Sequence, residues 1–420
     1  MARNSRFFDD KHPWSETKDA LLGNYLTPFF TKVYNASRDG IIYVDAFAGP
    51  GRFKDGTIGS PLLAIEKYQA VSKSRRAKRP IQFVFGEAKR GLRRQLEANA
   101  TDATNSVGYI KQPIIKDSFD EAMDCAVKVA VVGRKRPSTY FYYVDPFGVK
   151  YLRMAALLES PNPNHTEVLV NFNTVGFIRD ACEALRIAID VPSGIEILDV
   201  GFDDADLETE RIQRLNAAIG SDEWKSIIEA VRDKSMNYWE AEYRISQLFC
   251  CNARRKYAYV TSMPIKDMSR MVALGGEIKY RLVHMTNNAD GCILMNDEML
   301  RRKQNQQDTL PGFLTLDVDG KDVQPEVVQQ AMRDAVMQYP VGKQFQMRWV
   351  AAYVISRCGV FMNGTTLLRT YLKQLIEEGL IERVDKYRKD GKPRDNFAKE
   401  TLVYRSPTYQ TTIEFDGSSL

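Results

Sequence analysis

The sequence predicts an α/β protein whose central sheet is mostly parallel. Apolar runs of strand length alternate with helical patterns over residues 41–173, and such alternation is typical of βαβ units. The first run, 41–47, ends in a glycine turn followed by a helix, which is the opening of a nucleotide-binding βαβ unit. After about residue 326 the pattern changes to helices followed by two short strands. We therefore expect a Rossmann-like sheet with a helical insertion and a smaller C-terminal module.

The composition is that of an ordinary globular protein with more than one domain. The chain has 420 residues, of which 44% are hydrophobic and 27% are charged. The net charge of +5 is too small for a polycation, but basic residues gather in short clusters that can follow a phosphate backbone. Taken alone, each cluster is more often a solvated loop or helix face. The clusters lie at 75–79, 89–94, 134–136, 254–256 and 301–303.

Cysteine and histidine usage argues against a metal site, and hydropathy argues against a membrane segment. The six cysteines contain no C-x-x-C pair and the three histidines show no ligand spacing, so we expect reduced thiols and no metal. The N-terminal residues 1–5 have no apolar signal core, and no run of about eighteen apolar residues occurs. We therefore expect no membrane contact and a cytoplasmic location.

Two helices are expected to flank the first strand. Residues 17–36 carry apolar side chains along one wide face, which would pack on the sheet. Pro28 is expected to kink or split this helix, because proline cannot donate a backbone hydrogen bond. The second helix, 61–72, has Ser60 as its expected N-cap and Pro61 as its first residue.

The turn after the first strand carries an informative motif, in which Asp45 is followed by Phe47, Gly49 and Gly51 at alternate positions. The two glycines let the backbone approach a ligand that a Cβ atom would exclude. The motif lacks the third glycine of the dinucleotide fingerprint. It resembles the first motif of S-adenosylmethionine (AdoMet) methyltransferases, in which this turn receives the methionine end of the cofactor. The alternative is a glycine turn of a doubly wound fold without a cofactor.

Acidic residues follow the next two strands. Glu87 comes after the strand at 81–85, where nucleotide-binding folds often hold a ribose diol, although it can also be a charge at a helix N-terminus. Asp117 comes after the strand at about 108–115. An acidic residue at that position of the methyltransferase fold often contacts the adenine amine, whereas Asp117 can equally be the N-cap of a helix at 118–131.

The fourth strand, 139–144, is followed by Asp145-Pro146-Phe147-Gly148. A carboxylate and backbone carbonyls there can accept hydrogen bonds from an exocyclic NH₂ group, and the aromatic ring can stack on a base taken out of its helix. The tetrapeptide resembles the substrate-amine motif of amino-methyltransferases. It has one proline where the usual form has two, and this form resembles that of the tRNA guanine-N2 dimethyltransferases. The alternative is a plain turn after a buried strand.

The remainder of the sheet region contains an insertion and a closing strand pair. A fifth strand at 167–173 precedes a long, mainly helical stretch at about 174–255, which we interpret as an insertion or a cap over the site. Strands at 257–263 and 280–286 look like the antiparallel pair that ends a methyltransferase sheet. A helix at 292–303 closes this first domain, which we place at 1–303.

The C-terminal part is expected to be a separate module. Residues 304–325 are polar and contain glycine and proline, which predicts a linker with a short hairpin. Helices from 326, two strands and a basic turn at 386–399 predict a winged-helix-like domain at 326–420. Such modules bind DNA or other proteins.

Several of these motifs, taken in order, resemble the three-Cys-motif partner family. The resemblance covers roughly the first three hundred residues of the chain. It implies a bacterial or phage protein with a methyltransferase-like domain, and a partner protein whose three-cysteine motif resembles radical-AdoMet proteins. The motifs are His12-Pro13-Trp14, Tyr43 to Gly51, Gly59-Ser60-Pro61, Asp145 to Gly148 and His284-Met285-Thr286-Asn287.

The function expected from these motifs is an AdoMet-dependent methyltransferase that acts on a nucleobase exocyclic amine in DNA or RNA. The competing hypothesis is a catalytically silent fold that binds nucleic acid or the three-Cys-motif partner, in phage defence. In the first hypothesis catalysis is mostly orientation of the amine toward the methyl group, and no metal is needed. The expected site residues are Asp145, Pro146 and Phe147 for the substrate amine, and Asp45, Phe47, Gly49, Gly51, Glu87 and Asp117 for AdoMet.

Overall fold

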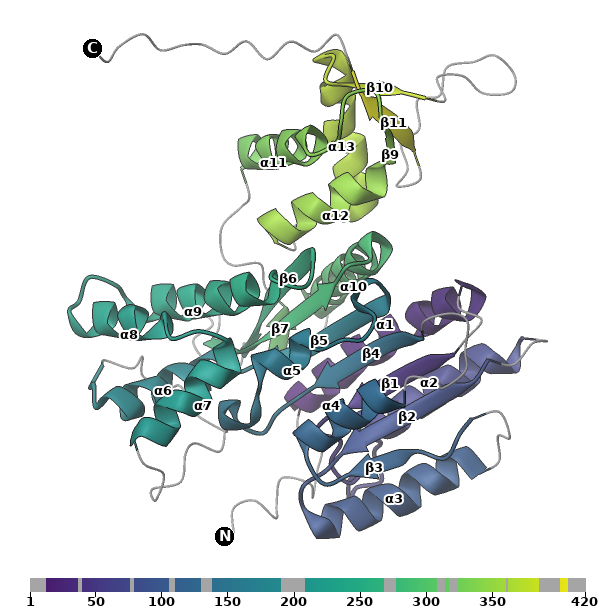
Figure 1. The fold of residues 1–420 in the computed structure, drawn as a ribbon, viewed down its shortest axis with the longest axis vertical. Coiled ribbons are helices and arrows are strands. Elements are labelled where there is room, and N and C mark those ends of the chain that lie inside the picture. The colour runs from purple at the N-terminus through teal and green to yellow at the C-terminus, as the bar shows by residue number, and fades with distance from the viewer. Residues whose placement is uncertain are drawn as a thin grey trace.

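The computed structural model is a mixed α/β structure in which helices cover both faces of a mostly parallel sheet (Figure 1). This arrangement is compatible with a Rossmann-like fold. A smaller sheet with its own helices follows at the C-terminal end. The residues that the structure describes are 13–36, 40–75, 79–105, 110–129, 138–189, 208–267, 277–307, 314–316, 324–359, 362–384 and 401–406.

Five parallel strands form the centre of the larger sheet. They are β1 (Ile41–Asp45), β2 (Ile81–Gly86), β3 (Ile114–Lys116), β4 (Thr139–Val144) and β5 (Thr166–Phe172). Strand β1 pairs with β2 on one side and with β4 on the other. The chain therefore runs outward from β1 to β3 and crosses back to β4, which makes a topological switch point between β1 and β4. Sheets of this kind bind ligands beside the carboxyl ends of the strands at such a point.

Three further strands complete the sheet in the order β3-β2-β1-β4-β5-β7-β6-β8. They are β6 (Tyr259–Asp267), β7 (Glu277–Thr286) and β8 (Leu314–Leu316). Strand β7 is antiparallel to both β5 and β6, so the predicted antiparallel strand pair is confirmed. Within the segment 304–325, predicted as a linker with a short hairpin, residues 314–316 pair with β6 and extend the sheet.

One face of the sheet is covered by helices from both ends of the sheet region. These helices are α1 (Pro13–Ala36), α2 (Ser60–Lys73), α3 (Arg90–Asn105) and α10 (Ala289–Gln307). The split expected at Pro28 is not observed, because α1 is one helix of 24 residues. The side chains of Leu26 and Phe29, on either side of Pro28, are buried on the sheet and hold the helix together there.

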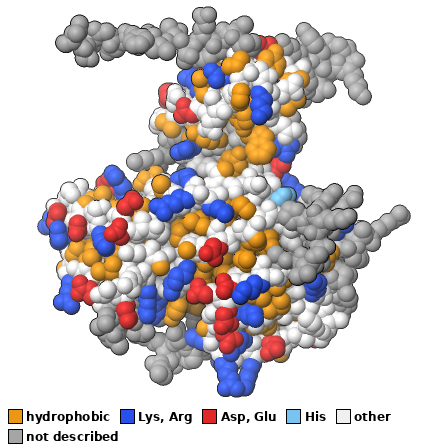
Figure 2. All heavy atoms as spheres, in the orientation of Figure 1, with side chains coloured by type: hydrophobic (Ala, Val, Ile, Leu, Met, Phe, Trp, Pro, Cys, Tyr) orange, Lys and Arg blue, Asp and Glu red, His pale blue; other side chains and the backbone are white. Residues whose placement is uncertain are grey.

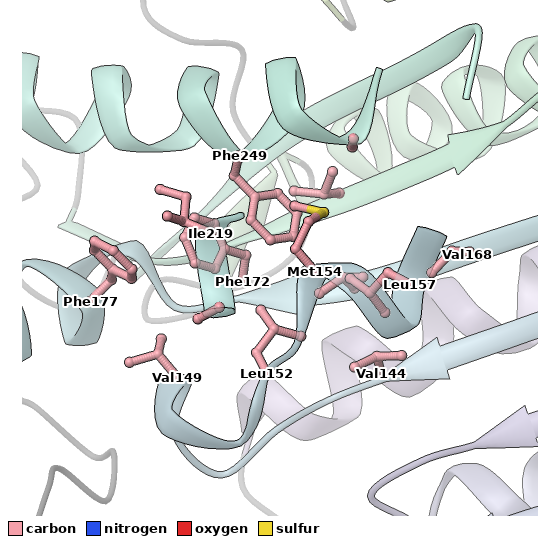
Figure 3. Packing of buried hydrophobic residues seen from close by; sticks show 14 of the residues in the cluster. Val144, Val149, Leu152, Met154, Leu157, Val168, Phe172, Phe177, Ile219 and Phe249 are labelled. Atoms are coloured by element: carbon pink, nitrogen blue, oxygen red, sulfur yellow. The ribbon is translucent and has the colours of Figure 1, made fainter. Parts of the chain in front are cut away.

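The other face is covered mainly by the helical insertion. The helices of the insertion are α6 (Thr174–Leu185), α7 (Glu208–Ile219), α8 (Trp224–Arg232) and α9 (Tyr238–Ala253). Two earlier helices, α4 (Phe119–Lys128) and α5 (Met154–Leu158), lie on the same face. Short 3-10 turns, η2 (Val149–Tyr151) and η3 (Pro163–His165), flank α5. Figure 3 shows Phe172 of β5 against Phe249 of α9, and their ring centroids lie 4.3 Å apart. The described part of the insertion therefore belongs to the hydrophobic core of the sheet.

The described residues of the C-terminal module form three helices and a three-stranded antiparallel sheet in the order β10-β11-β9. The expected strand pair is present, and the basic turn expected at 386–399 lies outside the described residues. The elements are α11 (Pro325–Met337), β9 (Gln344–Gln346), α12 (Met347–Cys358), α13 (Gly364–Glu377), β10 (Ile381–Arg383) and β11 (Leu402–Arg405).

Helix α10 connects the C-terminal module to the sheet. Its residues Cys292 and Ile293 belong to the core of the C-terminal module, whereas Met295 and Met299 belong to the core beneath α1. A Cβ atom on Gly364 of α13 would lie 2.7 Å from Cγ2 of Ile293, so the two helices touch closely. The module is therefore packed directly on α10.

The surface in view carries basic and acidic side chains interspersed with hydrophobic ones (Figure 2). The basic cluster at 134–136 lies outside the described residues. No described helix combines the length and apolar character needed to cross a membrane.

Candidate functional site

Predicted site residues gather at the carboxyl edge of the sheet, on both sides of the switch point. Asp45 is the last residue of β1, Glu87 follows β2 directly, and Asp145 follows β4 directly. Asn171, which sequence reasoning missed, lies near the end of β5. Since β1 and β4 are neighbours, their two aspartates stand side by side at the edge.

Asp45 is a fully buried carboxyl group held by two hydrogen bonds. Its Oδ2 accepts from the Ser60 hydroxyl at 2.5 Å and its Oδ1 accepts from the Phe47 backbone N–H at 3.3 Å. Burial raises the pKa of Asp45 to about 7, although both hydrogen bonds lower it. The nearby carboxylate of Asp145 raises it further. The site therefore contains a carboxyl group that changes charge near neutral pH.

Ser60 does not act as the predicted N-cap. Gly59 takes the capping position of α2, and the Ser60 side chain turns to Asp45 instead. Helix α2 is thereby tied to the end of β1. Both predicted and observed roles use a short hydroxyl side chain at a helix start, so the local sequence does not distinguish them.

The glycine turn after β1 is fixed by its neighbours. Gly49 and Gly51 have φ angles of 62° and 77°, in the left-handed region that favours glycine. The side-chain amide of Asn99 donates to the Pro50 carbonyl at 2.9 Å. A Cβ atom on Gly51 would lie 3.2 Å from Leu96 Cδ1, so this position faces α3. The turn is therefore held by α3 as well as by its own backbone.

Glu87 joins the loops that follow β1 and β2. Its Oε1 accepts from the Lys89 backbone N–H at 2.7 Å, and the backbone of Gly49 also donates to its carboxylate. Burial raises the pKa of Glu87. A carboxylate has about four lone-pair sites, so these two donors leave acceptor sites of Glu87 unused.

Asp117 lies at the rim of the edge. Its side chain is 63% exposed and forms an ion pair with Arg93 Nη1 at 3.1 Å. The N-cap of α4 is Ser118, whose hydroxyl accepts from the Glu121 N–H at 3.2 Å, so the interpretation of Asp117 as this cap is wrong. A contact of Asp117 with adenine stays a prediction.

Asp145 has a partner on each carboxylate oxygen. Its Oδ1 accepts from Asn171 Nδ2 at 2.6 Å, and its Oδ2 forms an ion pair with Lys18 Nζ of α1 at 2.5 Å. The Tyr143 hydroxyl lies 3.4 Å from Oδ2. The Asp145 side chain remains 23% exposed. We call Lys18, Asp145 and Asn171 the edge cluster.

The aromatic residues of the two motifs lie partly open beside these carboxylates. Phe47 stacks on Phe119 of α4 with ring centroids 5.4 Å apart. Pro146 and Phe147 are half-buried, and Lys89 Nζ lies 6.0 Å from the centre of the Phe147 ring. The loops after β2 and β4 thus approach each other across the end of β1.

A second polar cluster lies on the same face of the sheet, further from the carboxyl edge. Glu167 of β5 accepts a hydrogen bond from the Tyr25 hydroxyl of α1, and its Oε2 lies 3.1 Å from His284 Nε2 of β7. All three residues are buried. We call Tyr25, Glu167 and His284 the inner cluster. His284 belongs to the last motif of the resemblance, and its contacts are structural.

His12, from the first motif, lies outside the described residues. Asn287, which ends the last motif, accepts from the Ala258 N–H at 2.5 Å and donates to the Lys256 carbonyl at 3.1 Å. It therefore fixes the entry to β6. A groove of about 440 Å³ runs along α6 and the start of α9, and its lining, which includes Val175, Ile178, Cys182 and Tyr238, contains none of the predicted site residues.

Neither metal chemistry nor comparison with known proteins defines the site further. Within the described ranges, no group of three or more His, Cys, Asp or Glu side chains could hold a metal ion. No protein-family model matches the chain, and no curated protein matches it significantly. The functional argument therefore rests on the geometry of the carboxyl edge.

Proposed function

We propose that this protein is an AdoMet-dependent methyltransferase acting on a nucleobase exocyclic amine in DNA or RNA. The observation that carries the proposal is the gathering of Asp45, Glu87 and Asp145 around the glycine turn at the switch point. Open α/β sheets bind nucleotide-like ligands at this place. The reversed strand β7 between β5 and β6 also agrees with the methyltransferase-like sheet expected from the sequence.

The charges of the edge fit AdoMet, which carries a positive sulfonium and an ammonium group. Asp45 is buried, its hydrogen-bond donors Phe47 and Ser60 carry no charge, and burial together with the Asp145 carboxylate raises its pKa. A cation bound nearby would favour the ionised carboxylate. In this proposal the turn from Phe47 to Gly51 receives the methionine end, Glu87 the ribose and Asp117 the adenine. The bound cofactor would supply the methyl group.

The chain itself supplies positioning. Asp145 accepts an N–H of the target amine and so fixes the direction of the nitrogen lone pair. Phe147, which is half-buried beside it, offers a ring face for the base. Both act only when the base is out of its stack, so the reaction needs a flipped or single-stranded nucleotide.

The C-terminal module contributes affinity for the nucleic acid in this proposal, as a winged helix. Its three helices and small antiparallel sheet agree with that architecture. The competing proposal is a silent fold that binds nucleic acid or a three-Cys-motif partner. It is favoured by one observation, namely that Lys18 already occupies the carboxylate expected to hold the amine.

The test is tritium transfer from labelled AdoMet to total DNA and to total RNA, with wild type and Asp145→Ala. We expect the variant to lose at least about 100-fold in turnover, or about 3 kcal/mol, as is typical for one positioned polar group. AdoMet affinity by calorimetry should change little, because Asp145 is assigned to the substrate.

Asp222→Ala serves as the control, since Asp222 pairs with Lys225 at the start of α8, outside the edge. Equal incorporation by wild type and Asp145→Ala would remove Asp145 from the mechanism. Absence of incorporation by wild type on both nucleic acids, with AdoMet bound, would favour the silent fold.

A further inference from the structure

We propose that Asp145, Asn171 and Tyr280 form a binding site for a primary amine, and that Lys18 is its internal occupant, which a ligand amine displaces. Only the identity of that amine as a nucleobase NH₂ rests on the proposed function. The site itself follows from the contacts of the edge cluster.

The head group of Lys18 is held as an ammonium ligand would be. Its Nζ lies 2.5 Å from Asp145 Oδ2 and 5.3 Å from the centre of the Tyr280 ring. Carboxylates and aromatic faces are the groups that recognise ammonium ions in proteins. The Lys18 side chain is only 9% exposed, whereas lysine is almost never buried unless its charge is paired.

Asn171 adds an acceptor that Lys18 does not use. Its side-chain Nδ2 donates to Asp145, and because an ionised carboxylate can only accept, this contact fixes the orientation of the amide. The remaining oxygen, Oδ1, is buried, and no donor among the described residues reaches it. Asn171 as a whole is 7% exposed. A buried acceptor without a donor is unfavourable, so a ligand N–H placed there would be stabilised.

The number of donors selects an amine over a hydroxyl group. A primary amine has two N–H bonds and an ammonium group has three, so either can donate to Asp145 and to Asn171 together. A hydroxyl group has one donor and would leave one acceptor unsatisfied. The tether to α1 limits where Lys18 Nζ can lie, whereas a free amine has no such limit.

Lys18 is placed where it can leave. It lies near the start of α1, before Leu21, at which the run of fully buried side chains on the sheet begins. A lysine side chain has four rotatable bonds, so rotation of the side chain alone can carry Nζ into water. The Asp145 side of the pair is 23% exposed, and an ion pair that water can reach contributes little net stability, so a competing amine needs only modest affinity.

The first experiment is chemical rescue of Lys18→Ala in the full-length protein. Removing the side chain leaves the acceptors without a cation, and n-butylammonium at about 50 mM replaces the missing head group. We expect it to raise the Tm of Lys18→Ala by about 2 °C more than tetramethylammonium, which has the charge but no N–H donor.

Two variants complete the design. In wild type the tethered Lys18 competes with the added cation, and in Lys18→Ala with Asp145→Ala the acceptor is gone, so both proteins should distinguish the two cations less than Lys18→Ala does. Lys67→Ala, on α2, is the control for loss of a lysine. Equal Tm shifts from the two cations in Lys18→Ala would overturn the amine site.

A second measurement follows Lys18 directly by acetylation with acetic anhydride and mass spectrometry. Lys18 should react at least about ten times more slowly than Lys373, whose side chain is 76% exposed. Equal rates would overturn its role as occupant.

The same labelling with AdoMet and a mixed-sequence 20-nucleotide single strand, as DNA and as RNA, identifies the ligand. Faster acetylation of Lys18 on addition of the strand supports a nucleobase amine in its place. Successful rescue without such acceleration supports the amine site and overturns the nucleobase as its ligand. Methyl transfer is measured separately, so failure of the proposed function is distinguishable from failure of this inference.

Discussion

Helix α1 donates to two carboxylates of the sheet, and the two contacts differ in their access to water. Lys18 meets Asp145 in the edge cluster, where the carboxylate side chain is 23% exposed. Tyr25, about two helical turns further on, meets Glu167 in the inner cluster, where Tyr25 and His284 are both 0% exposed. Each contact joins a donor of α1 to an acidic residue of the same sheet.

The two clusters differ in whether the carboxylate can exchange its hydrogen-bond donor for another one. In the inner cluster no replacement donor can enter without local unfolding, so the contact serves stability alone. In the edge cluster water and ligands can reach the carboxylate, so the same type of contact can be exchanged. Chemical type alone would not distinguish the two clusters, whereas burial does.

The largest expected loss of stability comes from a substitution that breaks the inner cluster. Glu167→Ala leaves the Tyr25 hydroxyl and His284 Nε2 without their acceptor in the core, and we expect a loss of about 3–5 kcal/mol in the free energy of unfolding. Asp145→Ala should lose less, about 1–2 kcal/mol, because Lys18 can rotate its Nζ into water and only the buried Asn171 amide is left without its acceptor. Urea titration of both variants measures the difference. Similar losses would mean that the two clusters are equivalent.

A second effect concerns Asp45, which lies at the edge but is as buried as the inner cluster. Its pKa of about 7 exceeds the ordinary value of 3.8, so between these pH values the unfolded chain releases a proton that the folded protein keeps. The stability that this provides is complete below about pH 4 and is lost as the pH rises through 7. The loss can reach about 4 kcal/mol.

Asp45→Asn has no such proton and should therefore lose less stability between pH 5 and pH 8. We expect it to be more stable than wild type at pH 8 by roughly 2 kcal/mol, since no buried charge forms. Urea titrations at each pH unit test this, with Asp222→Asn on the surface as control. Parallel stability curves for wild type and Asp45→Asn would contradict the assigned burial effect.

The smallest stability changes are expected when either donor of α1, Tyr25 or Lys18, is replaced. Tyr25→Phe removes only the hydroxyl group that donates a hydrogen bond to Glu167. It should reduce the free energy of unfolding by about 1–2 kcal/mol. Lys18→Met removes the ammonium group but keeps a similar side-chain length, and it should change stability by less than about 1 kcal/mol. Thermal unfolding monitored by circular dichroism ranks the two. A larger loss for Lys18→Met than for Tyr25→Phe would mean that the contact of Lys18 with Asp145, and not that of Tyr25 with Glu167, stabilises the fold.

The sequence allowed the carboxyl edge to be predicted where the signal was local. Buried strands are readable as apolar runs, and the polar residue after each run must lie at the edge, which placed Asp45, Glu87 and Asp145 correctly. Ser60 was predicted to cap a helix, but its hydroxyl donates to Asp45, and this contact could not be predicted because Asp45 lies 15 positions away in sequence.

The partners of Asp145 could not be predicted in the same way. Lys18 lies 127 positions away from it, and the apolar face of α1 predicts packing on the sheet but not how far along the strands each residue falls. Asn171 lies inside the predicted strand 167–173, where a polar amide interrupts an apolar run, and this interruption was a signal that could have identified it. Its pairing with Asp145 required the neighbour relation of β4 and β5.

Helix α10 makes the two parts of the molecule thermodynamically dependent on each other. Some side chains of this helix complete the core of the C-terminal module and others complete the core under α1. Cutting the chain at the predicted linker would leave Cys292 and Ile293 uncovered by their partners. By the same coupling, a molecule that binds the C-terminal module alone also stabilises the sheet, because α10 cannot unfold from one without loosening the other.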